Sequence, residues 1–391
     1  MKLVFPSNIF FGTSTSAYQI ETAFQHDWQG LKAKDGYTFD RTTDHEKRFL
    51  DDVDIISSLA PNYRMSLMWS KLQRAPYGNL DRETVSEYHT LLKALSERNV
   101  KIMMVLYHWG NPNWFVASGG WENEQSVAIF LDFSKKLIFE FGEYITYWNT
   151  FNEPNLYTTF GYLMGKFPPY KRSLSSALKV IRNIGKAHNE IYSYIKSIDD
   201  SSMVGLSHNC VSFTYDNIFG MMPASLAKFW YMGIMQTHFS LFDYIGVSYY
   251  ARLSFDPIPV TYLERPQKFV NGRVHDLIWE YYPNGLELTI RNYWDKYHKP
   301  IIITENGVCT KNDNFRIQSL KDYMIIIHRL LQDKVDLRGY YHWSAWDNFE
   351  WTLGPTFKFG LYECDPDTMI RRKKPSADIF SRLSYKSEIT V

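Results

Sequence analysis

The strongest constraint on the fold is a regular alternation of short, apolar, β-rich runs with longer segments of helical spacing. Eight runs have the branched and aromatic content of strands, and they span 9–12, 62–68, 100–108, 144–152, 203–209, 244–250, 301–304 and 339–343. Between several of them, the segments 82–98, 125–141, 174–198 and 316–331 place apolar residues three and four positions apart. That spacing predicts amphipathic helices, so each strand is expected to be followed by a helix that covers it.

The strands themselves indicate a parallel sheet that is buried on both faces. The run KIMMVLY at 101–107, for example, is nearly continuous in apolar residues, as parallel strands between two layers of helices are. Eight strand–helix units predict an α/β fold of the closed (β/α)8 type, a TIM barrel. The 391 residues, 45% of them hydrophobic, suffice for one such domain over 1–391. An open doubly wound sheet is the alternative, but the sequence has no Gly-x-Gly-x-x-Gly or Walker motif.

The charge and cysteine content narrows the function classes. With 43 basic and 42 acidic residues the net charge is +1, so we expect neither a nucleic-acid nor a membrane partner. The basic run at 371–374 is expected to be a solvated surface turn. Three widely separated cysteines give neither a disulfide framework nor a metal-ligand spacing, and the N-terminal segment is a poor secretory signal. We therefore expect a soluble, cytoplasmic protein.

Two glutamates occupy equivalent positions at the ends of predicted strands. In TFNEPN, Glu153 follows the fourth strand, which Pro154 should end because proline cannot donate a ladder hydrogen bond. In IIITENG at 301–307, Glu305 follows the seventh strand. Barrel enzymes carry their chemistry at the C-terminal ends of the strands. Because strands four and seven are not neighbours, the two carboxyl groups are expected to face each other across the barrel mouth.

A pair of carboxyl groups in unlike surroundings suits the cleavage of a glycosidic bond. One carboxyl must stay protonated and protonate the leaving oxygen, while the other must be ionised and attack the anomeric carbon. Arg64, on the second predicted strand, would hold one glutamate ionised. We assign Glu305 as the nucleophile and Glu153 as the acid/base, although the two strand-end positions by themselves leave the reverse assignment open. A single glutamate at such a strand end is usually a capping or turn residue, and it is the pair in one barrel that favours catalysis.

The segments around these residues resemble glycoside hydrolase family 1, the family of β-glucosidases and β-galactosidases. The resemblance follows the chain in order, through 11–21, 62–66, 106–109, 150–154, 303–307 and 343–351. It implies a single (β/α)8 barrel, an exo-acting β-glucosidase with β-galactosidase or β-fucosidase activity as alternatives, and retention of configuration through a covalent glycosyl-enzyme. It also implies that no metal or other cofactor is needed. The expected partner is a small β-glycoside or short oligosaccharide.

The resemblance further implies a set of sugar-binding residues. A pyranose shows hydroxyls around its rim and C–H bonds on its faces, so it needs hydrogen-bonding side chains and flat aromatic surface. The resemblance assigns the rim to Gln19, His108, Asn152 and Glu350, a face to Trp343 and Trp351, and a hydrogen bond to Glu305 to Tyr250. Taken singly, the histidine and the tryptophans could be ordinary core residues. Tyr249 is expected to pack behind the sheet.

Several departures from the family pattern concern the other side of the cleft. Ser248 stands where the family usually has Asn, so we expect a contact near the acid/base to pass to water. Pro355 replaces a usual Tyr, and the chain is short between 21 and 52 and after 250. These differences predict a more open or remodelled aglycone side. Glucose is favoured over galactose, fucose and mannose, which differ from it by single hydroxyls.

Three alternative functions follow from the same residues. A 6-phospho-β-glycosidase is disfavoured because its relatives have Ser where this chain has Glu350, and because Phe357 and Phe359 occupy the positions of their phosphate-binding Lys and Tyr. A metal-dependent hydrolase lacks the expected ligand spacing, since no His-x-His or H-E-x-x-H occurs. A non-catalytic sugar-binding protein is disfavoured by the presence of both glutamates and Arg64.

Overall fold

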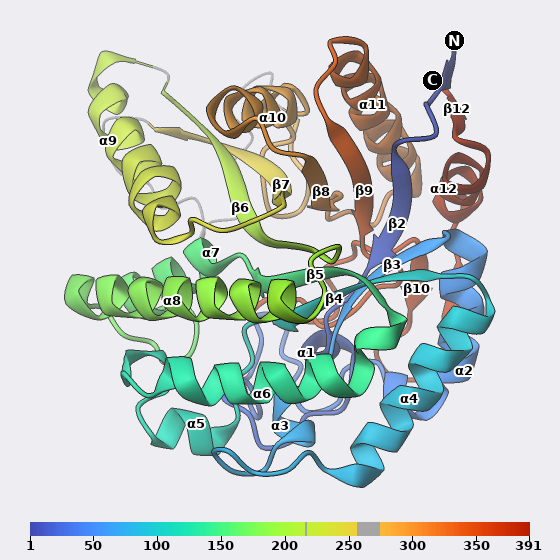
Figure 1. The fold of residues 1–391 in the computed structure, drawn as a ribbon. Helices are drawn as coiled ribbons and strands as arrows, with labels where there is room; N and C mark the ends of the chain where they lie inside the picture. Colours follow the sequence, from blue (N-terminus) through green and yellow to red (C-terminus); the bar gives the residue numbers. More distant parts are fainter. Residues whose placement is uncertain (216, 256–273) are drawn as a thin grey trace.

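A computed structural model of the protein describes residues 1–215, 217–255 and 274–391. Eight parallel strands close into a barrel in the order of the chain, from β2 to β9 (Figure 1). These strands are β2 (Phe10–Ser14), β3 (Asn62–Ser66), β4 (Lys101–Tyr107), β5 (Ile145–Asn152), β6 (Met203–Tyr215), β7 (Tyr244–Phe255), β8 (Ile301–Asn306) and β9 (Leu337–Trp343). The predicted (β/α)8 barrel is therefore confirmed, with all eight strands at the expected places.

Two strands extend well beyond their predicted ends. β6 was expected to end at residue 209 and β7 at residue 250, but they run on to Tyr215 and Phe255. After a register shift at Cys210, the two strands keep pairing in parallel from Val211 opposite Ala251 to the ends of both strands. We call residues 211–215 and 251–255 the β6–β7 arm. The arm projects from the barrel on the side where α9 (Ile218–Lys228) lies (Figure 1).

A helix follows every strand of the barrel and lies on its outer surface. These helices are α2 (His45–Leu59), α4 (Arg82–Glu97), α6 (Ser126–Phe141), α8 (Leu174–Ile198), α9, α10 (Asn284–Tyr297), α11 (Asp313–Gln332) and α12 (Pro375–Lys386). Short helices α1 (Ala17–Ile20), α3 (Trp69–Leu72), α5 (Asn113–Ala117) and α7 (Pro154–Thr158) sit in the loops. The expected start of α4 has a side-chain cap, because Asp81 accepts a hydrogen bond from the Thr84 amide at 3.0 Å. Among the described helices, none combines the length and the apolar character that a bilayer crossing needs.

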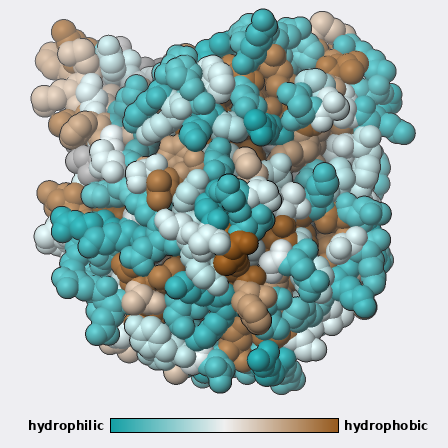
Figure 2. Space-filling view, viewed as in Figure 1, coloured by the Kyte–Doolittle hydropathy of each residue, from teal (hydrophilic) through white to brown (hydrophobic). Residues whose placement is uncertain are grey.

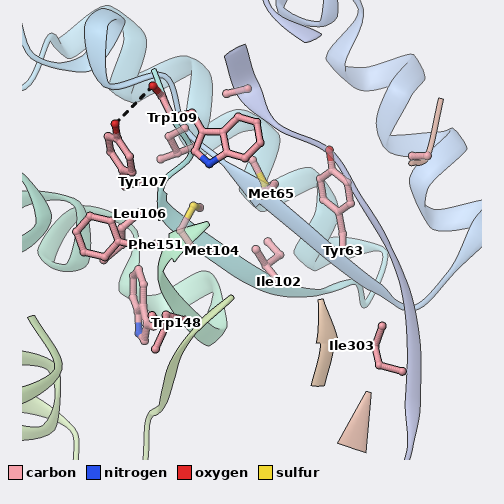
Figure 3. Close-up of a cluster of buried hydrophobic side chains, with 14 of the residues drawn as sticks. Tyr63, Met65, Ile102, Met104, Leu106, Tyr107, Trp109, Trp148, Phe151 and Ile303 are labelled. Carbon is pink, nitrogen blue, oxygen red and sulfur yellow. Dashed lines mark hydrogen bonds between the residues drawn. The ribbon is translucent and has the colours of Figure 1, made fainter. Parts of the chain in front are cut away.

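The main hydrophobic core fills the space between the barrel and these helices. Figure 3 shows part of it, where side chains from β3, β4 and β5 meet, among them Met65, Met104 and Phe151. A separate buried group of Met103, Tyr244, Ile302 and Tyr341 comes from four different barrel strands and fills the barrel interior. Gly12 makes room for it, since a Cβ there would lie 2.5 Å from the Tyr341 ring. The strands are thus buried on both faces, as their apolar sequences predict.

The antiparallel pairs β1 (Lys2–Val4) with β12 (Glu388–Thr390) and β10 (Tyr362–Cys364) with β11 (Arg371–Lys373) complete the sheet structure. The first pair joins the two ends of the chain, which lie side by side (Figure 1). The second corrects the expectation that the basic run at 371–374 is a solvated turn. The side chain of Arg371 is only 7% exposed and donates two hydrogen bonds to Asp52 of α2, at 3.0 and 2.9 Å. Its neighbours Arg372 and Lys373 are exposed, as expected.

Two aspartates of α2 provide a matched test of this buried ion pair. Asp52 accepts two hydrogen bonds from Arg371 in a site where its side chain is 1% exposed, whereas Asp54 pairs with Arg98 and is 68% exposed. Asp52→Ala leaves the guanidinium of Arg371 and the buried ring of His45 without the carboxylate that they share, so we expect a loss of about 3–5 kcal/mol in the free energy of unfolding. Asp54→Ala should cost about 0–1 kcal/mol. Urea denaturation measures both values, and equal losses would contradict the structural role of Arg371.

Candidate active site

The first predicted catalytic glutamate lies in a tight turn directly after a barrel strand. β5 ends at Asn152, and α7 begins with Pro154, which suits a helix start because it has no N–H to satisfy. Between them Glu153 has left-handed backbone angles, φ 45° and ψ 54°. For a residue other than glycine such a conformation costs about 1–3 kcal/mol. A hydrogen bond from the Glu153 amide to the Ser207 carbonyl, 2.8 Å long, helps to hold the turn.

The second glutamate is held by two donors at the end of β8. Arg64 Nη1 donates to Glu305 Oε1 at 2.6 Å, and Tyr250 Oη donates to Glu305 Oε2 at 2.9 Å. The contact with Tyr250 is the one that the sequence resemblance implies. A guanidinium and a hydroxyl that each donate to a different oxygen favour the ionised carboxylate over the neutral acid. The geometry therefore supports Glu305 as the charged member of the pair.

Arg64 connects this carboxylate to the rest of the barrel floor. Its side chain is fully buried, and besides Glu305 it donates to Ser14 Oγ at 3.1 Å, Asn152 Oδ1 at 2.6 Å and Ser207 Oγ at 3.3 Å. These acceptors belong to β2, β5 and β6, while Arg64 itself belongs to β3. One guanidinium thus sets the relative positions of side chains from most of the barrel.

The hydrogen bonds of Asn152 determine the state of His108. The Asn152 amide nitrogen Nδ2 donates to His108 Nε2 at 2.9 Å, so the ring proton sits on Nδ1. Burial, with a smaller effect of the nearby Arg64 charge, lowers the pKa of His108 well below its usual 6.5, and the ring is neutral. Nδ1 is buried and has no partner among the described residues. His108 itself lines the pocket, so its ring can contact a substrate there.

Glu153 has the opposite environment to Glu305. Burial raises the pKa of the Glu153 carboxyl well above its usual 4.5, and the negative charge of Glu305 raises it further. The nearby Arg64 and hydrogen bonds from Asn209 and Ser248 oppose this rise only in part. Glu153 is therefore a carboxylic acid that keeps its proton toward neutral pH, as a general acid must.

Besides Ser248, a longer side chain on the neighbouring strand also contacts the acid/base residue Glu153. Asn209 Nδ2 donates to Glu153 Oε1 at 2.9 Å, and Tyr231 Oη donates to Asn209 Oδ1 at 2.7 Å. Asn209 lies directly beside Ser248 in the register of β6 and β7. The side-chain amide of Asn209 thus lies close to the position at which the family pattern has the amide of an Asn in place of Ser248. The sequence contains a signal for it, since Asn209 is a polar residue at the predicted end of a barrel strand.

A polar cluster forms around Gln19 and Glu350. Gln19 Nε2 donates to Asn348 Oδ1 at 3.1 Å and lies 3.3 Å from Glu350 Oε2. Gln19 and Glu350 both line the pocket, and Gln19 Oε1 is buried without a partner in the described part of the chain. Burial, helped by the charge of Glu305, raises the pKa of Glu350 from 4.5 to about 8, against hydrogen bonds from Gln19 and Trp343.

The two predicted tryptophans are buried beside His108. The ring centre of His108 is 6.1 Å from the ring centres of Trp343 and Trp351, with interplanar angles of 33° and 26° respectively. Trp351 packs against Trp28 and Trp109, whose ring centres are 4.5 and 4.8 Å from its own. Both tryptophans line the same pocket, so each can present apolar surface to a ligand there. Tyr249 is fully buried and bonds the Tyr282 carbonyl, so it packs away from the pocket as expected.

The predicted site residues meet at one place. Nine of the ten line a single cavity of about 530 Å³ at the C-terminal ends of the strands, and Arg64 lies beneath it in contact with Glu305 and Asn152. Ser14, Ser207 and Asn209 belong to the same hydrogen-bond network but were not predicted. Short polar residues on barrel strands are common, so the sequence did not single out the two serines.

Comparison with known proteins agrees with this site. The family model described as Glycosyl hydrolase family 1 matches residues 1–215 and 239–389, and the chain belongs to that family. It is a glycoside hydrolase, a β-glycosidase of the β-glucosidase-like type. β-Glucosidase A of Acetivibrio thermocellus is 27% identical, with 96% of this chain and 97% of the relative aligned. The β-galactosidase of Saccharolobus solfataricus is 28% identical over 79% of this chain and 72% of its own length.

Solved structures show the same likeness in three dimensions. The β-glucosidase from Thermotoga maritima in complex with deoxynojirimycin superposes with a TM-score of 0.86 and 25% identity, over 97% of this chain and 98% of that one. The sequence prediction of the family and of its fold is confirmed.

The raised pKa of Glu350 predicts a pH-dependent cost to stability. In the unfolded chain this carboxyl ionises near its ordinary pKa of 4.5, whereas in the folded protein it keeps its proton up to about pH 8. Between these values the folded state binds more protons, so the contribution of Glu350 to stability falls as pH rises. Glu350→Gln removes this loss. Urea unfolding of both proteins should show the variant gaining on the wild type from pH 4.5 to 8, and a difference independent of pH would contradict the analysis.

Proposed function

We propose that the protein is an exo-acting β-glycosidase that retains configuration and prefers β-glucosides. The observation that carries this proposal is that Glu153 and Glu305 line one pocket in opposite electrostatic surroundings. Glu153 is a buried acid with a raised pKa, and Glu305 accepts hydrogen bonds from Arg64 and Tyr250. Double displacement places the two carboxyl groups about 5–5.5 Å apart, and we expect that separation in a substrate complex.

In the first step the glycosidic bond is exchanged for an ester bond to the enzyme. A carboxylate oxygen of Glu305 attacks the anomeric carbon from below, while Glu153 gives its proton to the glycosidic oxygen. The bond from the anomeric carbon to that oxygen breaks, and the aglycone leaves as a neutral alcohol. Arg64 and Tyr250 hold the nucleophile in place during this step.

In the second step water releases the sugar. Once Glu305 is esterified its negative charge is gone, and with it one of the two causes that raise the pKa of Glu153. Glu153, now a carboxylate, takes a proton from a water molecule that attacks the anomeric carbon. The bond to Glu305 breaks, its carboxylate returns, and the product has the β configuration of the substrate.

The floor of the pocket suits a glucose ring. Gln19, His108 and Asn152 line it with amide and imidazole groups that can form hydrogen bonds with the hydroxyls of a sugar. The preference for glucose draws support from relatives named β-glucosidase and from the Thermotoga maritima enzyme, whose bound deoxynojirimycin has a glucose-like ring. A sugar with a 6-phosphate fits less well, because the carboxyl of Glu350 and the apolar ring of Phe359 line the pocket.

Removal of the nucleophile tests the covalent intermediate. Glu305→Gly should lower turnover of 4-nitrophenyl β-glucoside by at least about 10⁴-fold, as the loss of a covalent nucleophile does. Added azide should enter the empty space and restore part of the rate. Because azide attacks in place of Glu305, the product should be the α-glycosyl azide, which NMR identifies. Formation of the β-azide, or a variant as active as the wild type, would overturn the mechanism.

Replacement of the acid/base tests the role of Glu153. Glu153→Gln should lower kcat/KM for alkyl glucosides by about 10²–10⁴-fold, because their leaving groups need protonation. Aryl glucosides with acidic phenols should be affected far less in the first step. The wild-type fall in rate at high pH, set by the raised pKa of Glu153, should be missing in the variant.

The matched control for this experiment is Glu97→Gln, since Glu97 is an exposed glutamate of α4 far from the pocket lining. It should leave both substrate classes and the pH profile unchanged. Equal losses for alkyl and aryl substrates in Glu153→Gln would contradict the acid/base role.

A further inference from the structure

The pocket extends outward from the catalytic residues along the β6–β7 arm. Val211 and Phe213 follow Asn209 at two-residue steps, and all three line the pocket. In the register of the two strands, Val211 lies opposite Ala251 and Phe213 opposite Leu253, which also line it. Side chains two residues apart share one face of a strand. The arm therefore forms a continuous apolar wall that begins beside the acid/base residue, Glu153.

Other segments add further apolar residues to the lining of the outer pocket, although Lys34 and Lys166 also line the pocket. Leu156, Phe160 and Met164, from the segment that follows Glu153, line it, together with Trp230 from the π-helical turn η4 (Phe229–Gly233). The Trp230 indole donates to Thr159 Oγ1 at 3.1 Å, so this hydroxyl of the lining is already engaged. In contrast, the carboxyl, amide and imidazole side chains of the pocket gather at its floor.

Apolar residues also lie outside the pocket, on α9. This helix leads into η4, and Ala227 at its end lines the pocket. Its outer side exposes Ile218, Met222, Leu226 and Phe229, which are 72%, 68%, 60% and 64% exposed. These residues recur at three- and four-residue steps, so they share one face of the helix. Figure 2 shows the hydrophobic residues gathered over α9 at the upper left.

Such a wall selects against a second sugar in the leaving-group position. A sugar ring would bring several hydroxyls against hydrocarbon side chains, and each hydroxyl that loses water without gaining a partner weakens binding. A hydrocarbon chain has the reverse effect, because every methylene that leaves water strengthens binding. Here the wall begins beside Glu153, so the first atoms of the aglycone already meet it.

We propose that the natural substrates are amphiphilic β-glycosides, in which the aglycone is a long hydrocarbon chain that lies along the β6–β7 arm. The sugar would be held by the polar floor and the chain by the apolar wall. As a statement about cleavage this rests on the proposed glycosidase function. As a statement about binding it can be tested independently of catalysis.

The test measures affinity for hydrolysis-resistant alkyl β-D-thioglucosides by calorimetry, with wild-type protein and ligand concentrations below micelle formation. From methyl through butyl and hexyl to octyl, each added methylene should lower Kd about two- to fourfold. The octyl compound should therefore bind at least about 100-fold more tightly than the methyl compound. Thiocellobiose, with glucose as its aglycone, should bind far more weakly than the octyl compound. A flat series, or tighter binding of thiocellobiose, would overturn the proposal.

A pair of leucine variants locates the effect. Leu253→Ser changes the arm, and we expect the ratio of methyl to octyl Kd to fall at least about fivefold. Leu174→Ser is the matched control, since Leu174 is an exposed residue at the start of α8 outside the pocket. Its ratio should equal that of the wild type. If the ratio of methyl to octyl Kd is unchanged in Leu253→Ser, or changes equally in both variants, the hydrocarbon chain of the ligand does not lie on the arm. Either result would contradict the proposal.

Hydrolysis of 4-nitrophenyl β-glucoside by the same preparation separates the two proposals. If the protein hydrolyses this substrate but Kd does not depend on the length of the alkyl chain, only the proposal of an amphiphilic substrate is overturned. A clear dependence without hydrolysis would overturn the glycosidase function and leave the apolar binding site standing.

Discussion

The buried guanidinium of Arg64 is the interaction on which the site depends. A buried charge is stable only if hydrogen bonds compensate for the lost water, and here acceptors from β2, β5, β6 and β8 bind Nη1 and Nη2, while Nε has no partner in the described part of the chain. The same group acts on its neighbours in different ways. It holds Glu305 through a charged hydrogen bond, it orients Asn152, and it helps to lower the pKa of His108. Closure of the barrel is what brings these partners within its reach.

Burial acts on two carboxyl groups of the pocket, Glu153 and Glu350, whereas Glu305 is in direct contact with the guanidinium of Arg64. Glu153 and Glu350 have raised pKa values, and in both cases the charge of Glu305 contributes after burial itself. The left-handed backbone at Glu153 adds a further local cost. Features of this kind lower stability but suit chemistry, and the large core between barrel and helices offsets them.

The long strands β6 and β7 make the site asymmetric. A regular barrel would end both strands near the level of the catalytic residues, but here the paired arm carries apolar side chains outward. Glu153 lies at the boundary, with a polar network through Asn209 and Tyr231 on one side. The floor therefore recognises a ligand through hydrogen bonds, and the wall through burial of apolar surface. The sugar of a glycoside is therefore selected by hydrogen bonding, and its aglycone by the burial of apolar surface.

The sequence by itself determined the eight strands, the main helices and the positions of Glu153 and Glu305, because apolar periodicity and strand-end polar residues are local signals. The ordered motifs also determined the family. Only the tertiary structure decided that Asn209 donates to Glu153, that Arg371 donates to Asp52, and that β6 and β7 continue as an arm. Partners such as Asp52 and Arg371 are far apart in the chain, so no local pattern pairs them. Their contacts, and the burial that shifts each pKa, exist only once the barrel has closed.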